Sequence, residues 1–537
     1  MTAHKERVTL LGASGTMGYQ AFLELQRRAE RYDVTLLLVP GDRRARKLAP
    51  YLQAAGIDPK VEAGVVEGRG LRVVWGDATR LDDVASAVAG SDWVLNAMAY
   101  ISPQADYRPA LAWAVNDAAI GNVLTAIAAE PGGAERICYV HTGSVAQTGN
   151  RPASGVAGAP GTYVGRIGDP MNPSVYDEYA LSKIAGERRV MESGLKHWVS
   201  LRMSFIMPCD HADLMALFDP IAFHMPLDTR MENITDRNAG LAMVNCLELR
   251  DDASFWRRAY NVGGGEQMRS NARDYLRSAY SLIGLDVGVC MDANWFALRN
   301  FHLQYFEDAG VTNSYLHYQT DDNASHQAAL EGSMTPLLKG VRWLNQRVAP
   351  MRRLMEWAVR LTFKRMAERH RNSPRRWYLD RNDARVRAFF GSYTAYEAIA
   401  PDALVVAPAA DGPWRRLDHG HDEQAVALDL PALRAAAAFR GGACLAAEWD
   451  GEWYAQLRWR CSAGHEFEAR VATVLRGGHW CPDCLATWNG GERALREPFF
   501  AQVWHADHDT AEVQPYPASG VEDVADADVL WRKPGRS

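Results

Sequence analysis

The first half of the chain alternates short apolar runs with longer amphipathic stretches. Runs of four to six largely apolar residues recur between Arg7 and Val262, and helical patterns separate them. Strands that alternate with helices in this way are typical of a doubly wound parallel sheet. We therefore predict an α/β fold with a small additional lobe before its last strand, and with strands at residues 8–11, 34–39, 71–75, 93–97, 137–141, 198–203 and 259–262.

The second half of the chain changes its pattern three times. Residues 296–400 are helical in pattern and rich in tryptophan and arginine, whereas residues 401–430 hold several prolines and little periodicity. Residues 431–537 combine a compact aromatic and cysteine-rich segment with an acidic tail. We predict a first domain over 1–295, a helical extension over 296–400, a linker over 401–430 and a C-terminal domain over 431–537.

Length and composition narrow the class of protein. A chain of 537 residues is too long for one compact core. Its 47% hydrophobic and 23% charged residues and its net charge of -6 are ordinary for a soluble protein and give no general reason to expect nucleic acid. The N-terminus is polar up to the first strand, and no apolar run reaches membrane-spanning length. We expect a cytoplasmic protein without a signal peptide or transmembrane segment.

A glycine-rich turn, GASGTMG, follows the first predicted strand. The first glycine permits a tight turn, the second lets the backbone approach a pyrophosphate, and the third allows the next helix to pack closely. That helix would present its N-terminal N–H groups to the phosphates. The sequence therefore predicts a dinucleotide site that includes Gly12, Ser14, Gly15, Thr16, Met17 and Gly18.

Tyr179 and Lys183 lie four residues apart in the sequence YALSK. On a helix this spacing puts both side chains on one face. A neighbouring ammonium group favours the phenolate, which makes tyrosine a usable proton donor and acceptor near neutral pH. With the dinucleotide turn, the pair predicts hydride-transfer chemistry.

Further motifs lie in the order found in the extended short-chain dehydrogenase/reductase family, and residues 7–290 resemble its epimerase/dehydratase-like branch. These motifs are GDAT at 76–79, NAMA at 96–99, VNDAAIGNVLTAI at 115–127, LRMSFIMP at 201–208 and YNVGGGE at 260–266. The resemblance implies a Rossmann-like sheet, adenine contacts from Asp77 and Ala78, a cofactor-lining stretch with Ala97, and Asn116 near the active centre.

The turn HTGSVA resembles the hydroxyl-bearing turn of this family. The resemblance implies that the Thr142 hydroxyl binds the substrate oxygen, that Tyr179 exchanges its proton, and that Lys183 holds the nicotinamide ribose and lowers the pKa of the tyrosine. Ser144 is the alternative hydroxyl. Sugar dehydratases of the family carry an acidic pair where this chain has Gly143 and Ser144, so we do not expect elimination of water.

We expect an NAD(P)-dependent oxidoreductase that interconverts a ketone and a secondary alcohol on a small-molecule substrate. A nucleotide-sugar epimerase with tightly bound NAD is an alternative, because it needs the same hydride transfer and proton relay. After the second strand, Arg43, Arg44 and Lys47 suit the 2'-phosphate of NADP, whereas Asp42 suits the ribose of NAD. We expect NADP, in contact with Arg43, and leave NAD open.

Residues 339–376 are strongly basic, with only Glu356 and Glu368 among many lysines and arginines. One helical stripe in this segment is apolar and consists of Met351, Leu354, Met355, Ala358 and Leu361. We expect the stripe to pack on the neighbouring domain with the charges in water. An anionic membrane surface, or a phosphorylated or carrier-linked substrate, is the alternative partner.

Cysteine usage near the C-terminus predicts a structural zinc site. Three thiolates and one imidazole would complete a tetrahedral shell with no position for a water nucleophile. The predicted ligands, in two knuckles, are Cys461, His465, Cys481 and Cys484. Cys444 or His479 is the alternative to His465.

The segment 441–491 resembles small zinc-ribbon modules of bacterial and plant proteins, some of them linked to nucleic-acid enzymes. A nucleic acid, another protein or the reductase domain itself would be its partner. A dinucleotide-sensing regulator that uses this ribbon to bind nucleic acid is therefore a second alternative function. The sequence also leaves a homodimer open.

Overall fold

The computed structural model describes most of the chain. The described residues are 5–149, 151, 162–215, 219–405, 414–425 and 427–525. Parts of the predicted linker over 401–430 and of the acidic tail of 431–537 lie outside these ranges. In the described part, the predicted linker region contributes a short strand, β14 (Trp414–Arg415), which pairs with β7 (Thr162–Tyr163) of the first domain.

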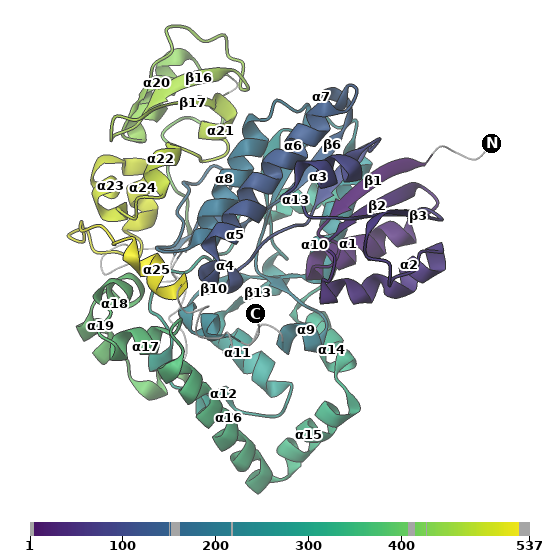
Figure 1. Ribbon diagram of the computed structural model, residues 1–537. Helices are drawn as coiled ribbons and strands as arrows, with labels where there is room; N and C mark the ends of the chain where they lie inside the picture. The colour runs from purple at the N-terminus through teal and green to yellow at the C-terminus, as the bar shows by residue number, and fades with distance from the viewer. Residues whose placement is uncertain are drawn as a thin grey trace.

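An eight-stranded sheet forms the centre of the first domain, in the order β12-β8-β6-β5-β1-β2-β4-β3 (Figure 1). All neighbours pair in parallel except β3 and β4. The prediction of a doubly wound, Rossmann-like α/β sheet is confirmed. The strands are β1 (Glu6–Leu11), β2 (Tyr32–Leu38), β3 (Gly64–Gly68), β4 (Leu71–Trp75), β5 (Trp93–Asn96), β6 (Cys138–Ser144), β8 (His197–Met203) and β12 (Arg258–Val262).

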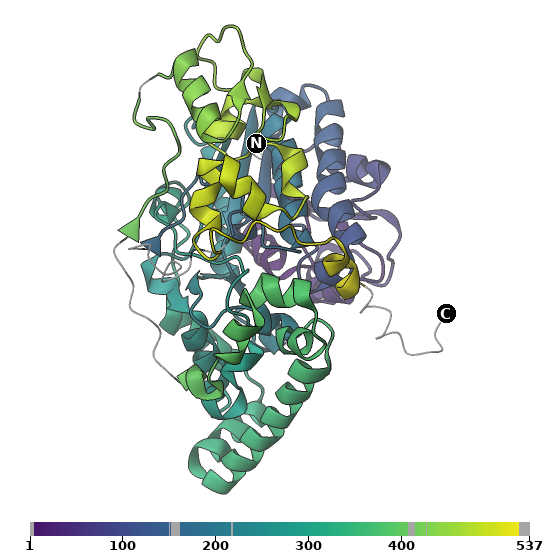
Figure 2. The ribbon, with the colours of Figure 1, turned by 90° about the vertical axis from the view of Figure 1, so that its left-hand side faces the viewer.

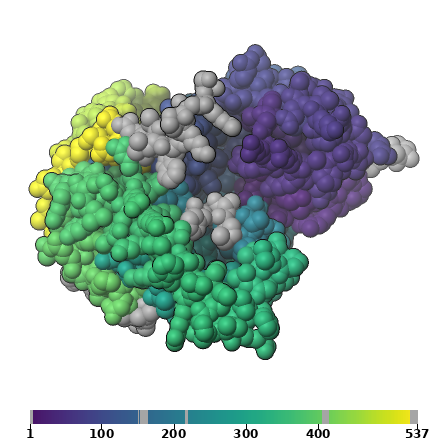
Figure 3. All heavy atoms as spheres, turned by 60° about the horizontal axis from the view of Figure 1, so that its bottom comes forward, coloured from purple at the N-terminus to yellow at the C-terminus, as the bar shows by residue number. Residues whose placement is uncertain are grey.

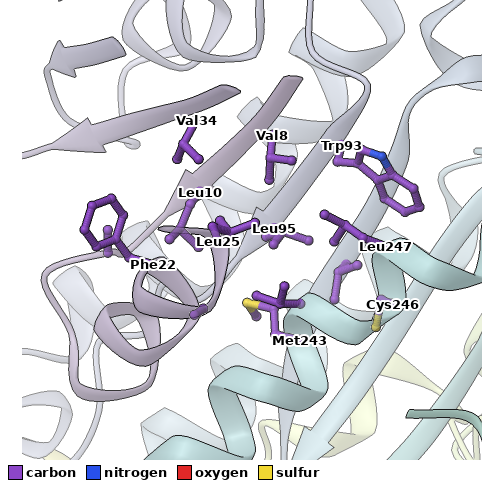
Figure 4. Packing of buried hydrophobic residues seen from close by; sticks show 14 of the residues in the cluster. Val8, Leu10, Phe22, Leu25, Val34, Trp93, Leu95, Met243, Cys246 and Leu247 are labelled. Carbon is purple, nitrogen blue, oxygen red and sulfur yellow. The ribbon is translucent and has the colours of Figure 1, made fainter. Parts of the chain in front are cut away.

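Helices cover both faces of this sheet. On one face, α1 (Thr16–Arg27) and α10 (Asp236–Asn245) bury Phe22, Leu25 and Met243 against the strands (Figure 4). On the other face, α3 (Leu81–Val88), α6 (Ala119–Ala129) and α8 (Glu178–Glu192) bury a second apolar cluster. The strands are buried on both sides, which explains their nearly continuous apolar sequences.

One strand of the eight-stranded sheet was not predicted. β3 forms an antiparallel hairpin with β4 at the edge of the sheet, and its sequence, GVVEG, is mostly exposed. A short, exposed edge strand with two glycines lacks the apolar run by which the other strands are recognised.

One helical segment has the length and hydropathy of a membrane span. It runs from Pro109 to Ala129 through α5 (Pro109–Trp113), a π-helical turn at Ala114–Ala118, and α6. α6 belongs to the apolar core between the sheet and α3, and the core helix of a soluble protein can have the same length and hydropathy.

The small lobe and the extension are built mainly from helices and short strand pairs. Their strands are β9 (Ile206–Met207), β10 (Arg230–Glu232), β11 (Ile234–Thr235) and β13 (Arg269–Asn271). Their helices are α9 (His211–Met215), α11 (Ala272–Ser281), α12 (Val287–Cys290), α13 (Ala309–Leu316), α14 (Asn323–Ser333), α15 (Pro336–Arg347), α16 (Ala349–Arg369), α17 (Pro374–Leu379), α18 (Asp383–Phe390) and α19 (Tyr393–Glu397). Three short helices decorate the first domain, namely α2 (Ala49–Ala55), α4 (Gln104–Tyr107) and α7 (Gly133–Arg136).

Helix α16 buries a different face from the predicted stripe. Its buried residues are Glu356, Phe363 and Ala367, whereas Leu354 is exposed. The expectation that Leu354 packs on a neighbouring domain is therefore wrong. The helix is turned so that Phe363 reaches the apolar cluster around Phe223.

The C-terminal part lies beside α8 of the first domain (Figure 2). An antiparallel sheet of β15 (Ala443–Cys444), β16 (Gln456–Arg460) and β17 (Glu466–Arg470) packs with α20 (Leu430–Phe439) and α21 (Val471–Leu475). The chain then continues through α22 (Pro482–Leu485), α23 (Gly490–Arg496), α24 (Pro498–Trp504) and α25 (Ser519–Ala525). These last helices share one apolar cluster with α18 and with the start of α8.

Candidate functional site

The glycine turn connects β1 to α1 at the end of the sheet where the parallel strands terminate. Gly12 has φ +83°, and a Cβ there would lie 2.8 Å from the backbone of Ala97 and Met98. A Cβ on Gly18 would lie 2.1 Å from the Gly12 carbonyl oxygen. Both positions therefore require glycine, and no side chain caps the N-terminus of α1 at Gly15. This leaves the helix N-terminus available for a pyrophosphate.

Asp42 lies beside this turn, after β2. The Ser14 hydroxyl donates a hydrogen bond of 2.7 Å to its carboxylate, and Arg44 donates from its backbone N–H and its guanidinium. Burial opposes the charge on Asp42, but the hydrogen bonds from Arg44 and Ser14 outweigh it and lower its pKa. An ionised carboxylate at this point can accept hydrogen bonds from hydroxyl groups.

The basic residues predicted to bind a 2'-phosphate differ in exposure and in their hydrogen-bond partners. Arg43 is exposed, and Arg44 is paired with Asp42. The Lys47 ammonium donates to the Gly15 carbonyl oxygen at 3.3 Å and lies 4.6 Å from the centre of the Tyr19 ring.

Two other stretches that the resemblance assigned to the cofactor lie at the ends of neighbouring strands. After β4, Asp77 accepts hydrogen bonds from the backbone and hydroxyl of Thr79, and Ala78 is buried. After β5, Ala97 contacts the glycine turn and is half-buried.

Tyr179 and Lys183 lie in the first turns of α8. The Lys183 ammonium is buried and donates a hydrogen bond to the Thr142 carbonyl oxygen, and burial lowers the pKa of this lysine to about 8. Burial raises the pKa of Tyr179 to about 12, although a hydrogen bond with Ser144 acts in the opposite direction. In this state, therefore, the tyrosine pKa is not lowered as the resemblance implied, because burial dominates.

The two candidate hydroxyls behave differently. Thr142 Oγ1 donates to the Asn96 carbonyl oxygen at 2.7 Å, which ties it to the neighbouring strand β5. Ser144, the last residue of β6, is the hydroxyl near enough to Tyr179 to lower its pKa. The structure thus brings Ser144, rather than Thr142, together with Tyr179. The sequence motif contains both hydroxyls and could not separate them.

Asn116 lies in the π-helical turn between α5 and α6. Its amide accepts from the Tyr100 backbone N–H at 2.8 Å and donates to the Tyr100 carbonyl and the Ser182 hydroxyl at 3.0 Å each. It therefore holds the loop after β5 against α8. Single π-turns are frequent at functional sites.

A buried network lies behind Ser144 and was not predicted. Glu187 of α8 accepts hydrogen bonds from Gln147 at 2.8 Å, from Ser200 at 2.6 Å, from Arg202 at 2.7 Å and from His479 at 2.9 Å. All five side chains are at most 1% exposed. Burial opposes the charge on Glu187, but Arg202 and His479 outweigh it and hold its pKa well below the usual value.

Gln147 connects this network to the turn that carries Ser144. Its side-chain oxygen accepts a hydrogen bond of 2.6 Å from the Ser144 backbone N–H. His479 comes from the C-terminal part, two residues before Cys481. A continuous chain of hydrogen bonds therefore runs from His479, next to the cysteine knuckle, through Glu187 and Gln147 to the turn that carries Ser144.

A second unpredicted group of titratable residues lines a small polar pocket at the start of α8. His302 Nδ1 lies 2.9 Å from the Asp177 carboxylate. Burial, together with the charge of Asp177, raises the pKa of Asp106 to about 7. Arg385 of the helical extension lines the same pocket. The extension thus contributes to the surroundings of α8.

The structure brings the four predicted metal ligands together. Cys461 Sγ lies 3.7 Å from Cys484 Sγ, and His465 Nδ1 lies 3.5 Å from the sulfurs of both Cys481 and Cys484. All four ligand atoms lie within 4.8 Å of one another. Tetrahedral zinc with Zn–S bonds of about 2.3 Å and Zn–N bonds of about 2.1 Å fits these spacings.

The alternative ligands lie elsewhere. Cys444 is outside this ligand cluster, and His479 is bonded to Glu187. Of the candidates for the fourth ligand, His465 is therefore the residue in position.

No protein-family model matches the chain, and no curated protein matches it. Among solved structures, MoeE5 in complex with UDP-glucose and NAD has a TM-score of 0.45 at 16% identity, over 61% of this chain and 98% of that one. The dTDP-glucose 4,6-dehydratase of Bacillus anthracis, in complex with NAD, has a TM-score of 0.43 at 12% identity, over 64% of this chain and 99% of that one. WbmG of Bordetella bronchiseptica, in complex with NAD, has a TM-score of 0.41 at 16% identity, over 62% of this chain and 94% of that one.

At such low identities and TM-scores these likenesses concern the fold alone. The substrates in those structures are properties of those proteins. Other solved structures with similar likeness are described as a putative epimerase, a second dTDP-glucose 4,6-dehydratase and a short-chain dehydrogenase/reductase superfamily protein.

Proposed function

We propose that the protein is a nicotinamide-dependent oxidoreductase that interconverts a ketone and a secondary alcohol. The observation that carries this proposal is the position of the buried Lys183, which is hydrogen-bonded to the end of β6, one turn of α8 from Tyr179, whose phenol lies near enough to Ser144 for that hydroxyl to lower its pKa. The glycine turn and Asp42 lie at the ends of the neighbouring strands, where open α/β sheets bind their ligands.

The chain's own residues can provide every proton that the reaction needs. A bound nicotinamide would supply or accept the hydride. In the direction of reduction, Tyr179 Oη donates its proton to the carbonyl oxygen and the Ser144 hydroxyl donates a hydrogen bond to the same atom. The Lys183 ammonium stabilises the resulting phenolate by its charge.

We assign the role of the substrate-binding hydroxyl to Ser144 instead of Thr142. Thr142 Oγ1 already donates to the Asn96 carbonyl, whereas the Ser144 hydroxyl acts on the pKa of the tyrosine. Ser144→Ala should lower kcat about 100-fold, and Thr142→Val should lower it less than about tenfold. Equal losses in the two variants would contradict this assignment.

We propose NAD as the cofactor, in place of the NADP favoured by the basic sequence after β2. The ionised Asp42 carboxylate is held in place by Ser14 of the glycine turn. It can therefore accept hydrogen bonds from ribose hydroxyls, but its charge would repel a 2'-phosphate. Isothermal titration should give tighter binding of NADH than of NADPH, and Asp42→Ala should reduce that preference at least tenfold. A wild-type preference for NADPH would refute this choice.

The function is tested with a panel of sugars, acyl thioesters and small ketones, followed at the nicotinamide absorbance. We expect turnover of at least one substrate class, and Tyr179→Phe should abolish it while NADH binding persists. Activity that survives in Tyr179→Phe would contradict the mechanism. Silence across the whole panel would instead favour the regulator, which should bind nucleic acid with a steep salt dependence.

A nucleotide-sugar epimerase is the second candidate, because Ser144, Tyr179 and Lys183 would serve it equally well. A transient ketone would be formed and reduced again on the opposite face, so the cofactor would be recycled. Epimerisation without net change in NADH would identify this reaction. Net, stoichiometric oxidation of NADH would identify the oxidoreductase.

We also propose that Cys461, His465, Cys481 and Cys484 hold a structural zinc ion. Three thiolates and one imidazole close the coordination shell, so the metal supplies folding energy to the small β-sheet module and performs no chemistry on the substrate. Elemental analysis should find one zinc per chain. Cys484→Ser should lower this content, whereas Cys444→Ser should retain it, and the opposite result would contradict the ligand set.

A further inference from the structure

Helices α15 and α16 form a hairpin at the end of the molecule opposite the zinc module (Figures 1 and 2). Helix α16 contacts α12 and α17, and its buried residues are Glu356, Phe363 and Ala367. The remaining sides of the hairpin face outward, and Figure 3 shows its surface at the free lower edge of the molecule.

Large apolar side chains lie on these outward sides. Leu337 is 77% exposed, and Leu354 is 56% exposed. Two tryptophans are also exposed, Trp343 by 56% and Trp357 by 62%. Scattered single hydrophobic residues are normal on a protein surface, but several on one protruding hairpin indicate an interaction site.

The same hairpin is cationic. Residues 336–369 contain nine lysines and arginines against two glutamates, in a chain whose net charge is -6. The carboxylates are engaged, because Glu356 is buried and accepts from the Asp286 backbone, and Glu368 pairs with Arg375. Within the described chain, the exposed Arg353, Lys364 and Arg365 make no ion pair, so their charges face water.

We propose that this hairpin docks on the surface of an anionic lipid bilayer. Tryptophan and leucine beside unpaired basic residues suit the boundary between lipid headgroups and acyl chains, where the rings are buried and the cations meet phosphates. A second copy of the chain would bring two cationic faces together, which charge repulsion opposes. The chemistry of this surface thus selects an anionic lipid layer and is independent of the function proposed above.

Flotation of the full-length protein with lipid vesicles tests the proposal. The protein should float with vesicles of phosphatidylcholine and phosphatidylglycerol and stay unbound with phosphatidylcholine alone. Trp343→Ala combined with Trp357→Ala should lower the partition coefficient at least about tenfold. Arg353→Glu combined with Lys364→Glu and Arg365→Glu should do the same, and added salt should weaken wild-type binding.

Leu495→Ala is the matched control, because Leu495 is 63% exposed on α23 of the C-terminal part. It should bind anionic vesicles like the wild type. All variants should keep the thermal unfolding midpoint of the wild type, since the altered side chains are exposed. The proposal is overturned if the wild type does not float, if the hairpin variants bind as tightly as Leu495→Ala, or if they instead convert a dimer to a monomer or abolish binding to a single-stranded oligonucleotide.

Discussion

Lys183 is the residue at which the proposed function and the stability of the fold conflict. Its ammonium is buried beside the Thr142 carbonyl and near Glu187, and burial lowers its pKa from 10.5 to about 8. Protonation of this lysine is therefore less favourable in the folded protein than in the unfolded chain, which lowers the stability of the fold at neutral pH. Such costs are typical of residues retained for activity.

Lys183→Met should stabilise the protein while it abolishes turnover. Below pH 8, a pKa shift of this size destabilises the folded wild type by about 3 kcal/mol, and the substitution removes this penalty. The substitution also removes the hydrogen bond to Thr142, which stabilises the wild type by about 1 kcal/mol. We therefore expect a net gain of about 1–2 kcal/mol in the free energy of unfolding at pH 7. Denaturant unfolding measures it. Between pH 8 and 10.5 the unfolded state binds more protons than the folded state, so wild-type stability should rise with pH.

The variant should lack this rise, because it has no lysine to titrate at the position. Lys60→Met serves as the control, since Lys60 is exposed and its replacement should change neither stability at pH 7 nor the pH profile. A wild-type stability that is flat or falls over this pH range would contradict the assigned cost.

At the scale of elements, the loop between α21 and α22 connects two sites. It carries His479 into the first domain to bond Glu187, and it carries Cys481 into the cluster of candidate metal ligands. Arg202 also donates a hydrogen bond of 2.7 Å to the Gly477 carbonyl of this loop. The loop therefore braces α8 and the turn of Ser144 from behind, and we regard His479 as a positioning residue.

His479→Ala should lower both stability and kcat. Removal of one partner from a buried carboxylate costs about 1–3 kcal/mol, and looser placement of Ser144 should lower kcat while KM for the substrate stays near the wild-type value. His479→Gln, which keeps a donor, should restore part of kcat. Steady-state kinetics with thermal unfolding measure both effects.

His326→Ala is the matched control for this prediction. His326 is also buried, but its Nε2 bonds the Pro208 carbonyl at 3.0 Å in a different part of the fold. It should lose stability without loss of kcat. If His479→Ala behaves in the same way, the positioning role is refuted and the histidine is only structural.

At the scale of the whole molecule, the last described helices connect the parts of the chain. Trp504 of α24 and Tyr516 share an apolar cluster with Trp377 and Phe389 of the extension and with Leu181 of α8. Arg299 adds hydrogen bonds to Glu512 and to the Asp507 carbonyl. Because this cluster draws on three parts of the chain, we expect them to unfold together.

Trp504→Ala should therefore destabilise the whole protein, and not only its C-terminal part. Loss of a buried tryptophan costs about 3–5 kcal/mol and should lower the midpoint of a single calorimetric transition. Leu495→Ala, in the neighbouring helix but exposed, should leave that midpoint unchanged. A separate low-temperature transition in Trp504→Ala, with the main one unmoved, would show that the parts are independent.

The sequence by itself determined most of the sheet, the glycine turn and the grouping of three cysteines with one histidine. Each is encoded locally: apolar runs mark buried strands, the glycine at position 18 is required by a backbone contact with Gly12 within one turn, and the candidate ligands come in pairs with short spacings. Only the tertiary structure decided that Ser144 meets Tyr179, that His479 supports Glu187, and that Leu354 faces water. These outcomes depend on which distant surfaces pack together, and no local spacing records the partner of a buried polar group.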